Sequence, residues 1–158
     1  MDTSTASSRF PLKVSEPVVR AIALEVFVLA GITVLTASLW PALILAVDFA
    51  LRSIVNPGLS PLRLVARQGL VPLFHAKDRP VFYSPKRFAA LIGLTLSLLA
   101  LAGSLFGARE LTVAAAGVLT LFSFLEAAFG FCAGCRIYGF LMRSGVIPIE
   151  WCPECVNL

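Results

Sequence analysis

The sequence predicts an all-α integral membrane protein with four transmembrane helices in two hairpins and a short interfacial amphipathic helix between the second and third spans. Composition is the first ground for this fold class. Hydrophobic residues make up 58% of the chain, charged residues only 14%, and the mean hydropathy is +0.90, whereas soluble domains are about half apolar and about a quarter charged. Length is the second ground. A bilayer core about 30 Å thick takes about 20 apolar residues per helix, so this chain allows about four crossings and no large soluble domain.

The first apolar block covers residues 21–55 and follows a polar tail at residues 1–20. The block is too long for one ordinary crossing and long enough for two short ones. Trp40 and Pro41 lie near its middle, and Trp favours the membrane interface while Pro is tolerated at the start of a helix. The pair therefore predicts a tight turn between two spans. One long helix kinked at Pro41 is the alternative.

A loop is predicted at residues 56–87, because Asn56-Pro57-Gly58 combines strong helix breakers. Within it, residues 60–74 place leucines and valines at roughly helical intervals, with Arg63 and Arg67 on another side. This pattern is typical of a short helix in the headgroup region. Gly69 and Pro72 favour the alternative, a solvated loop.

Residues 88–106 and 111–131 are the third and fourth predicted spans, joined by a turn at residues 107–110. The four-span domain then covers residues 21–143, and residues 144–158 form a cysteine-containing tail. Small residues in the last span predict close approach of neighbouring helices; they are Ala114, Ala115, Ala116, Gly117, Ala127, Ala128 and Gly130.

Positive charge predicts the orientation of the chain. With four crossings, both termini and the loop at 56–87 share one side of the membrane, and twelve of the thirteen Lys and Arg residues fall there, leaving Arg109 opposite. Cytoplasmic loops carry such an excess, so we expect both termini in the cytoplasm. The basic residues flank apolar spans and form no stripe with interleaved aromatics, which argues against nucleic acid as a partner.

All four cysteines lie in the stretch FCAGCRIYGFLMRSGVIPIEWCPEC, residues 131–155. On the predicted cytoplasmic side, paired cysteines more often bind metal or carry out redox chemistry than form structural disulfides. The spacing of Cys132 and Cys135 from Cys152 and Cys155 fits a zinc site with four thiolate ligands. Zinc is therefore a candidate cofactor, held by all four sulfurs in a non-enzymatic membrane scaffold.

A redox function is the other hypothesis, with Cys132 and Cys135 as the catalytic pair. It requires a thiol with a lowered pKa, which a helix amino terminus or a nearby cation provides. Arg136 adjoins the first pair and favours it, whereas Glu150 and Glu154 surround the second pair and oppose it. If the last span continues as a helix through the motif, both sulfurs of the first pair lie on one face.

Three acidic residues lie within the apolar spans, where an ionised carboxylate costs a few kcal/mol. Asp48 is one helical turn from Arg52, which predicts an ion pair. Glu25 lies near the start of its span, within reach of Arg20 or the interface. Glu126 precedes Cys132 by six residues, and both a structural role and a proton path toward the thiols stay open for it.

The stretches VSEPVVRAIA, SPKRFAALIG and FCAGCRIYGFL carry a resemblance. Over most of residues 14–142 the chain resembles the domain-of-unknown-function family 4395, small bacterial integral-membrane proteins with a helix-end Cys-x-x-Cys. The resemblance implies a bacterial inner membrane location. It also implies a role near sulfur transfer or thiol redox balance, with a thioredoxin-like or rhodanese-like protein as the partner. Only Cys132 and Cys135 match the family motif. The expected partners are thus the lipid bilayer and such a soluble protein, and formation of an oligomer stays open.

Overall fold

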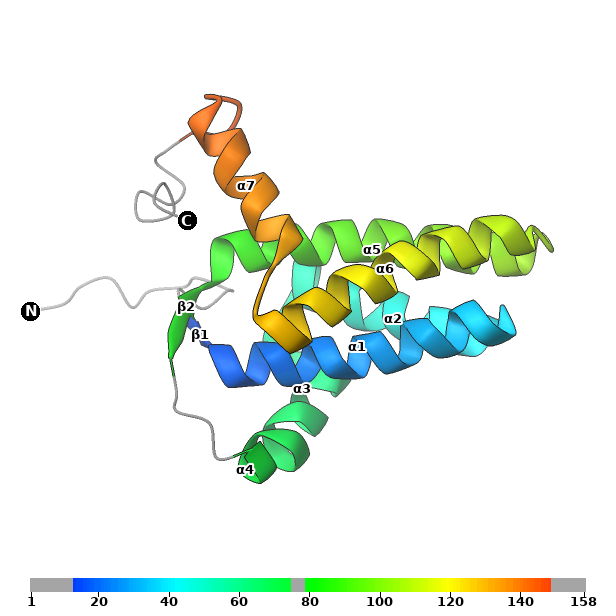
Figure 1. Cartoon of the computed structure of the whole chain (residues 1–158), viewed down its shortest axis with the longest axis horizontal. Helices are drawn as coiled ribbons and strands as arrows, with labels where there is room; N and C mark the ends of the chain where they lie inside the picture. Colours follow the sequence, from blue (N-terminus) through cyan, green and yellow to red (C-terminus); the bar gives the residue numbers. More distant parts are fainter. Residues whose placement is uncertain (1–12, 75–78, 149–158) are drawn as a thin grey trace, which may run out of the picture.

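A computed structural model describes residues 13–74 and 79–148 of the chain. Its elements are, in order, β1 (Lys13–Ser15), α1 (Glu16–Thr36), α2 (Leu39–Ala50), η1 (Leu51–Val55), η2 (Pro57–Leu59), α3 (Pro61–Val65), η3 (Ala66–Leu70), α4 (Val71–Phe74), β2 (Pro80–Phe82), α5 (Tyr83–Leu105), α6 (Arg109–Phe129) and α7 (Ala133–Arg143). Within these ranges, α1, α5 and α6 are the three helices long and apolar enough to cross a membrane. They lie side by side with α2 in a bundle (Figure 1).

Helix α1 begins five residues before the first predicted span. Glu16 lies in its first turn with Pro17 beside it, and proline suits this place because the first N–H groups of a helix have no partner within it. The helix ends where Ala37 adopts a left-handed conformation at φ 48°. The chain therefore turns at Ala37 and Ser38. Trp40 and Pro41, predicted as the turn, instead lie in the first turn of α2.

Helix α2 continues into η1, a stretch of wider π-helical turns, so the chain is helical over residues 39–55. Asn56 then breaks the helix, and its side chain accepts a hydrogen bond from the Gly58 N–H at 2.8 Å. The predicted breaker is thus confirmed as the end of this segment.

The helix predicted at residues 60–74 is present in the structure. Ser60 caps its start by accepting a hydrogen bond from the Arg63 N–H at 3.1 Å, and α3, η3 and α4 follow without a break. The π-helical stretch η3 contains Gly69 and ends directly before α4, which holds Pro72. Wider turns here fit a helix that must accommodate a residue lacking an N–H donor.

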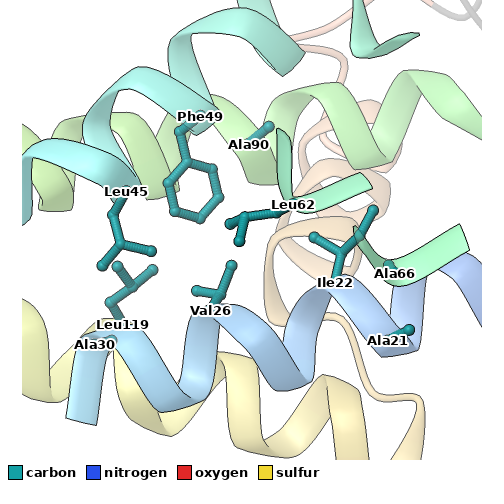
Figure 2. Packing of buried hydrophobic residues seen from close by; sticks show 10 residues of the cluster. All are labelled: Ala21, Ile22, Val26, Ala30, Leu45, Phe49, Leu62, Ala66, Ala90 and Leu119. Atoms are coloured by element: carbon teal, nitrogen blue, oxygen red, sulfur yellow. The ribbon is translucent and has the colours of Figure 1, made fainter. Parts of the chain in front are cut away.

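The core lies where α1, α2, α5 and α6 meet. Val26, Leu45, Phe49 and Leu119 point toward one another between these helices (Figure 2). Where helices approach most closely the residues are small, with Ala30, Ala42 and Ala116 almost fully buried. Large apolar side chains such as Val28, Leu98 and Leu121 point outward instead. This outward apolar surface is consistent with contact to lipid.

Two short strands were not predicted. Strand β1 pairs antiparallel with β2, with Val14 opposite Val81. The pairing joins the start of α1 to the start of α5, and α6 ends at the same end of the bundle (Figure 1). The cysteine motif is therefore held at the end where the polar segments of the chain gather.

Candidate functional site

The cysteine motif lies at the start of a new helix and not on a continuation of the last long one. Gly130 ends α6 in a left-handed conformation at φ 67°, which glycine adopts without the cost that a side chain brings. Two residues later, Cys132 occupies the N-cap of α7. The interpretation in which one helix runs through the motif is therefore wrong, and both thiols instead lie at a helix amino terminus.

This position stabilises a thiolate at Cys132. Its sulfur accepts a hydrogen bond from the Cys135 N–H at 3.3 Å, and the amino end of a helix carries a partial positive charge. The hydrogen bond from the Cys135 thiol lowers the pKa of Cys132, and Lys86 and the Cys135 N–H act in the same direction, against burial and the charge of Glu126. The same thiol contact, followed by burial, raises the pKa of Cys135. These contacts favour the thiolate form of Cys132 and the protonated form of Cys135.

Glycine inside the motif allows α7 to contact α5. A Cβ atom at Gly134 would lie 2.6 Å from the Ala89 Cβ and 2.7 Å from its Cα, well inside the about 3.5–4.0 Å of a normal carbon contact. Further along α7, Tyr138 and Met142 are buried against Phe82 and Phe88, and α7 extends away from the long axis of the bundle (Figure 1). The glycine and this small cluster fix the thiols against the start of α5.

Lys86 and Glu126 form an ion pair between α5 and α6 close to the thiols. Both side chains are about four-fifths buried, at 18% and 19% exposure. Lys86 acts electrostatically on both cysteines, whereas Arg136 is exposed and its guanidinium lies 5.4 Å from the centre of the Phe131 ring. The cation that assists the thiols is therefore Lys86, a residue that the sequence argument counted only as a loop charge.

A cavity of about 620 Å³ opens beside this ion pair. Cys132, Lys86 and Glu126 line it, together with Arg63 and Arg67 from the helical segment at 61–74. Its lining also includes apolar residues such as Val26, Leu96 and Leu119. The volume falls within the about 300–1,000 Å³ of ligand-binding pockets, so a ligand of that size would lie against the Cys132 side chain.

Asp48 has a structural role. Its carboxylate pairs with Arg52 at 2.6 Å, which confirms the predicted ion pair. It also accepts hydrogen bonds from the Ser60 hydroxyl at 2.5 Å and from the Leu62 N–H at 3.2 Å. These contacts satisfy a carboxylate that is fully buried and attach the segment at 61–74 to α2.

Glu25 does not pair with Arg20, one of the two alternatives that the sequence left open for it. Arg20 instead donates hydrogen bonds to the carbonyl oxygens of Ala127, at 3.2 and 3.0 Å, and Ala128, at 3.0 Å. These carbonyls lie in the last turn of α6, where a cation compensates the helix dipole. Both Glu25 carboxylate oxygens are buried and accept no hydrogen bond from a residue that the structure describes.

Cys152 and Cys155 lie outside the described residues. Over residues 13–74 and 79–148, no group of three or more His, Cys, Asp or Glu side chains is placed to hold a metal ion. In the described part of the chain, Cys132 and Cys135 are free thiols.

Comparison with known proteins identifies the family of the chain. A family model described as "Domain of unknown function (DUF4395)" matches residues 14–143. This range includes the long helices α1, α5 and α6 as well as the Cys132–Cys135 motif. No curated protein and no solved structure matches the chain. The chain belongs to the DUF4395 family, whose function is unknown.

Proposed function

We propose that this protein is a membrane thiol oxidoreductase in which Cys132 and Cys135 exchange electrons with a soluble thioredoxin-like or rhodanese-like partner. The observation that carries the proposal is the asymmetry of the pair. Cys132 is the N-cap residue of a helix and accepts the Cys135 N–H, which favours its thiolate, while Cys135 keeps its proton beside it. A nucleophilic thiol next to a resolving thiol is the arrangement that thiol–disulfide exchange requires.

The exchange proceeds through a mixed disulfide. A thiolate of the reduced partner attacks the Cys132–Cys135 disulfide at Cys132, which forms a partner–Cys132 bond and releases Cys135, and the latter takes up a proton. The second partner thiolate then attacks the partner sulfur of that bond and releases Cys132 as a thiolate. Two electrons pass from the partner dithiol to this protein, and the partner leaves as a disulfide.

We place the thiols on the cytoplasmic face of the membrane. The helical stretch at 39–55 is about 25 Å long at about 1.5 Å per residue, enough for a short fourth crossing. With four crossings, β1, β2 and the start of α7 share one side, and the opposite turn carries Arg109 alone among the basic residues. The segment at 61–74 exposes Leu64 and Val65 beside its arginines, as expected of a helix in the headgroup region.

Orientation is tested with a membrane-impermeant maleimide. We expect Cys132 to be labelled in inverted inner-membrane vesicles and not from the periplasmic side in spheroplasts. A variant without native cysteines that carries Leu105→Cys is the matched control, because Leu105 is 64% exposed at the other end of α5. Labelling of Cys132 in spheroplasts as strong as that of the control would overturn the orientation.

Exchange is tested by trapping. The Cys135→Ser variant is first oxidised at Cys132 with 5,5′-dithiobis(2-nitrobenzoate). The thiolate of a thioredoxin that lacks its resolving cysteine should then displace thionitrobenzoate and accumulate as a mixed disulfide with Cys132, while Cys132→Ser should form none. The double variant Cys152→Ser/Cys155→Ser is the control and should exchange like the native protein. If Cys132 instead gains the mass of one sulfur atom from a persulfide-loaded rhodanese and no mixed disulfide forms, sulfur relay replaces electron exchange as the function.

Zinc bound by all four cysteines is the competing proposal, and metal analysis decides between the two. Electron exchange predicts protein that is active without bound zinc after purification in the absence of chelators. One zinc per chain, lost in the Cys152→Ser/Cys155→Ser variant together with protease resistance of the tail, would favour the scaffold function.

A further inference from the structure

The residues that line the cavity beside Cys132 extend from the polar end of the bundle toward its apolar centre, and we call this cavity the shaft. On α1 its lining extends from Pro17 to Val26, and on α5 from Tyr83 to Leu96. At about 1.5 Å per residue, the shaft is roughly 15–20 Å deep. It therefore reaches to about the middle of a bilayer-spanning helix.

The two ends of the shaft differ in chemistry. Toward the polar end of the bundle the lining includes Cys132, Tyr83 and the Lys86–Glu126 ion pair. The arginines Arg52, Arg63 and Arg67 also line the cavity. Arg52 is paired with Asp48, whereas neither Arg63 nor Arg67 forms an ion pair with a residue that the structure describes. The inner end is lined by Val26, Leu96, Leu119 and Phe122. A molecule that fits both ends has a polar head with hydrogen-bond acceptors and an apolar tail.

We propose that the cavity binds a lipid-soluble quinone, with its ring beside Cys132 and its tail in the shaft, and that the quinone accepts the electrons of the Cys132–Cys135 pair. This inference rests on the proposed function and names the acceptor for it. The Cys135 S–H bond breaks and an S–S bond forms between Cys135 and the Cys132 thiolate. Two electrons, the Cys135 proton and one proton from solvent pass to the ring, which becomes a quinol, and the disulfide that the soluble partner reduces is regenerated.

The apolar depth of the cavity distinguishes this ligand from other candidates. A water-soluble oxidant would make no favourable contact with the deep part of the shaft, which Val, Leu and Phe side chains line. An anionic lipid would fit both the arginines and the apolar walls, but it cannot accept electrons from thiols. Among molecules with a polar head and an apolar tail, a quinone is a two-electron acceptor that dissolves in the bilayer.

The test uses the full-length protein, reduced and reconstituted in nanodiscs without oxygen, with decylubiquinone and menadione as probes. We expect one quinol per Cys132–Cys135 pair and no quinol from Cys132→Ser. Ala23→Phe and Val19→Phe place a ring inside the shaft, and each should raise the quinone concentration for half-maximal rate at least tenfold while thioredoxin exchange is unchanged. Val28→Phe, on the half-exposed outer side of α1, is the matched control and should behave like the native protein.

A photoreactive azidoquinone gives a second measurement that does not depend on thiol activity. In the Cys132→Ser/Cys135→Ser variant we expect crosslinks to α1, α5 or α6 residues of the shaft, competed by decylubiquinone. Exchange with thioredoxin without quinol formation would overturn the quinone inference and leave the proposed function in place. Crosslinks that phosphatidylglycerol displaces and decylubiquinone does not would likewise overturn it, in favour of a lipid. Crosslinking in the shaft with no thiol exchange would support the site while refuting the proposed function.

Discussion

Replacing Gly134 with alanine should separate α7 from α5 and disturb the thiols. The added Cβ would lie 2.6 and 2.7 Å from Ala89 atoms, so α7 must withdraw by about 1 Å to restore a normal contact. Such overpacking costs about 1–3 kcal/mol. Gly117→Ala is the control, because nothing lies within 4 Å of its added Cβ and alanine stabilises a helix by about 0.5–1 kcal/mol over glycine. Both glycines lie inside helices, so this gain cancels between the variants, which should differ by the overpacking cost of about 1–3 kcal/mol in unfolding free energy.

Two assays measure the effect. Denaturant unfolding in micelles gives the free energy, and the rate of iodoacetamide alkylation at neutral pH reports the Cys132 thiolate, which should decrease in Gly134→Ala. Adding Ala89→Gly removes the closer of the two clashing atoms and should restore part of both quantities, since the Ala89 Cα remains. If Gly134→Ala is as stable and as reactive as Gly117→Ala, or if Ala89→Gly rescues nothing, the close contact of α7 with α5 is refuted.

Further predictions concern the charges around the site. Lys86→Met should raise the pKa of Cys132 and Glu126→Gln should lower it, because Lys86 favours the thiolate and Glu126 opposes it. The pH profile of Cys132 alkylation should therefore move to higher pH in Lys86→Met and to lower pH in Glu126→Gln. Shifts of both profiles in the same direction would contradict this assignment. Asp48→Asn should destabilise the fold by about 3–5 kcal/mol, because it leaves Arg52 without its buried partner. Ser60→Ala removes both a hydrogen bond to the same carboxylate and the cap of α3, and should cost about 2–4 kcal/mol in unfolding measurements.

The long apolar helices could be predicted closely from the sequence. The stretches at 88–106 and 111–131 form α5 and α6 with ends shifted by at most five residues, because continuous apolar sequence leaves a helix as the favoured structure in lipid. The ion pair between Asp48 and Arg52 could be predicted equally well, since it depends only on helical spacing. Features that depend on residues close together in the sequence, such as long helices and pairs one helical turn apart, could therefore be predicted.

The partner of Glu126 was missed because it depends on tertiary structure, although a signal was present. Lys86 and Glu126 lie twenty residues on either side of Phe106, next to the turn between α5 and α6. In an antiparallel hairpin, residues at equal distances from the turn face the same level of the bundle. Applying this rule to the charged residues of the two spans would have found the pair.

The new helix at the cysteine motif was missed for a different reason. Gly130 was interpreted only as a small packing residue, whereas a glycine after a long apolar run is also typical of a helix end. Treating it as an end places Cys132 at the start of the next helix. The pairing of β1 with β2 carried no such signal, because three-residue strands separated by residues 16–79 leave no pattern in the sequence.

The contacts of Arg20 determine when in folding the site takes shape. They connect the first helix to carbonyl groups 107 and 108 positions further along the chain, immediately before the turn at Gly130. Translation delivers α1 to the bilayer long before α6, so the guanidinium has no acceptor there until synthesis is nearly complete. The cysteine turn therefore gains its final position only when the last long helix docks onto the first.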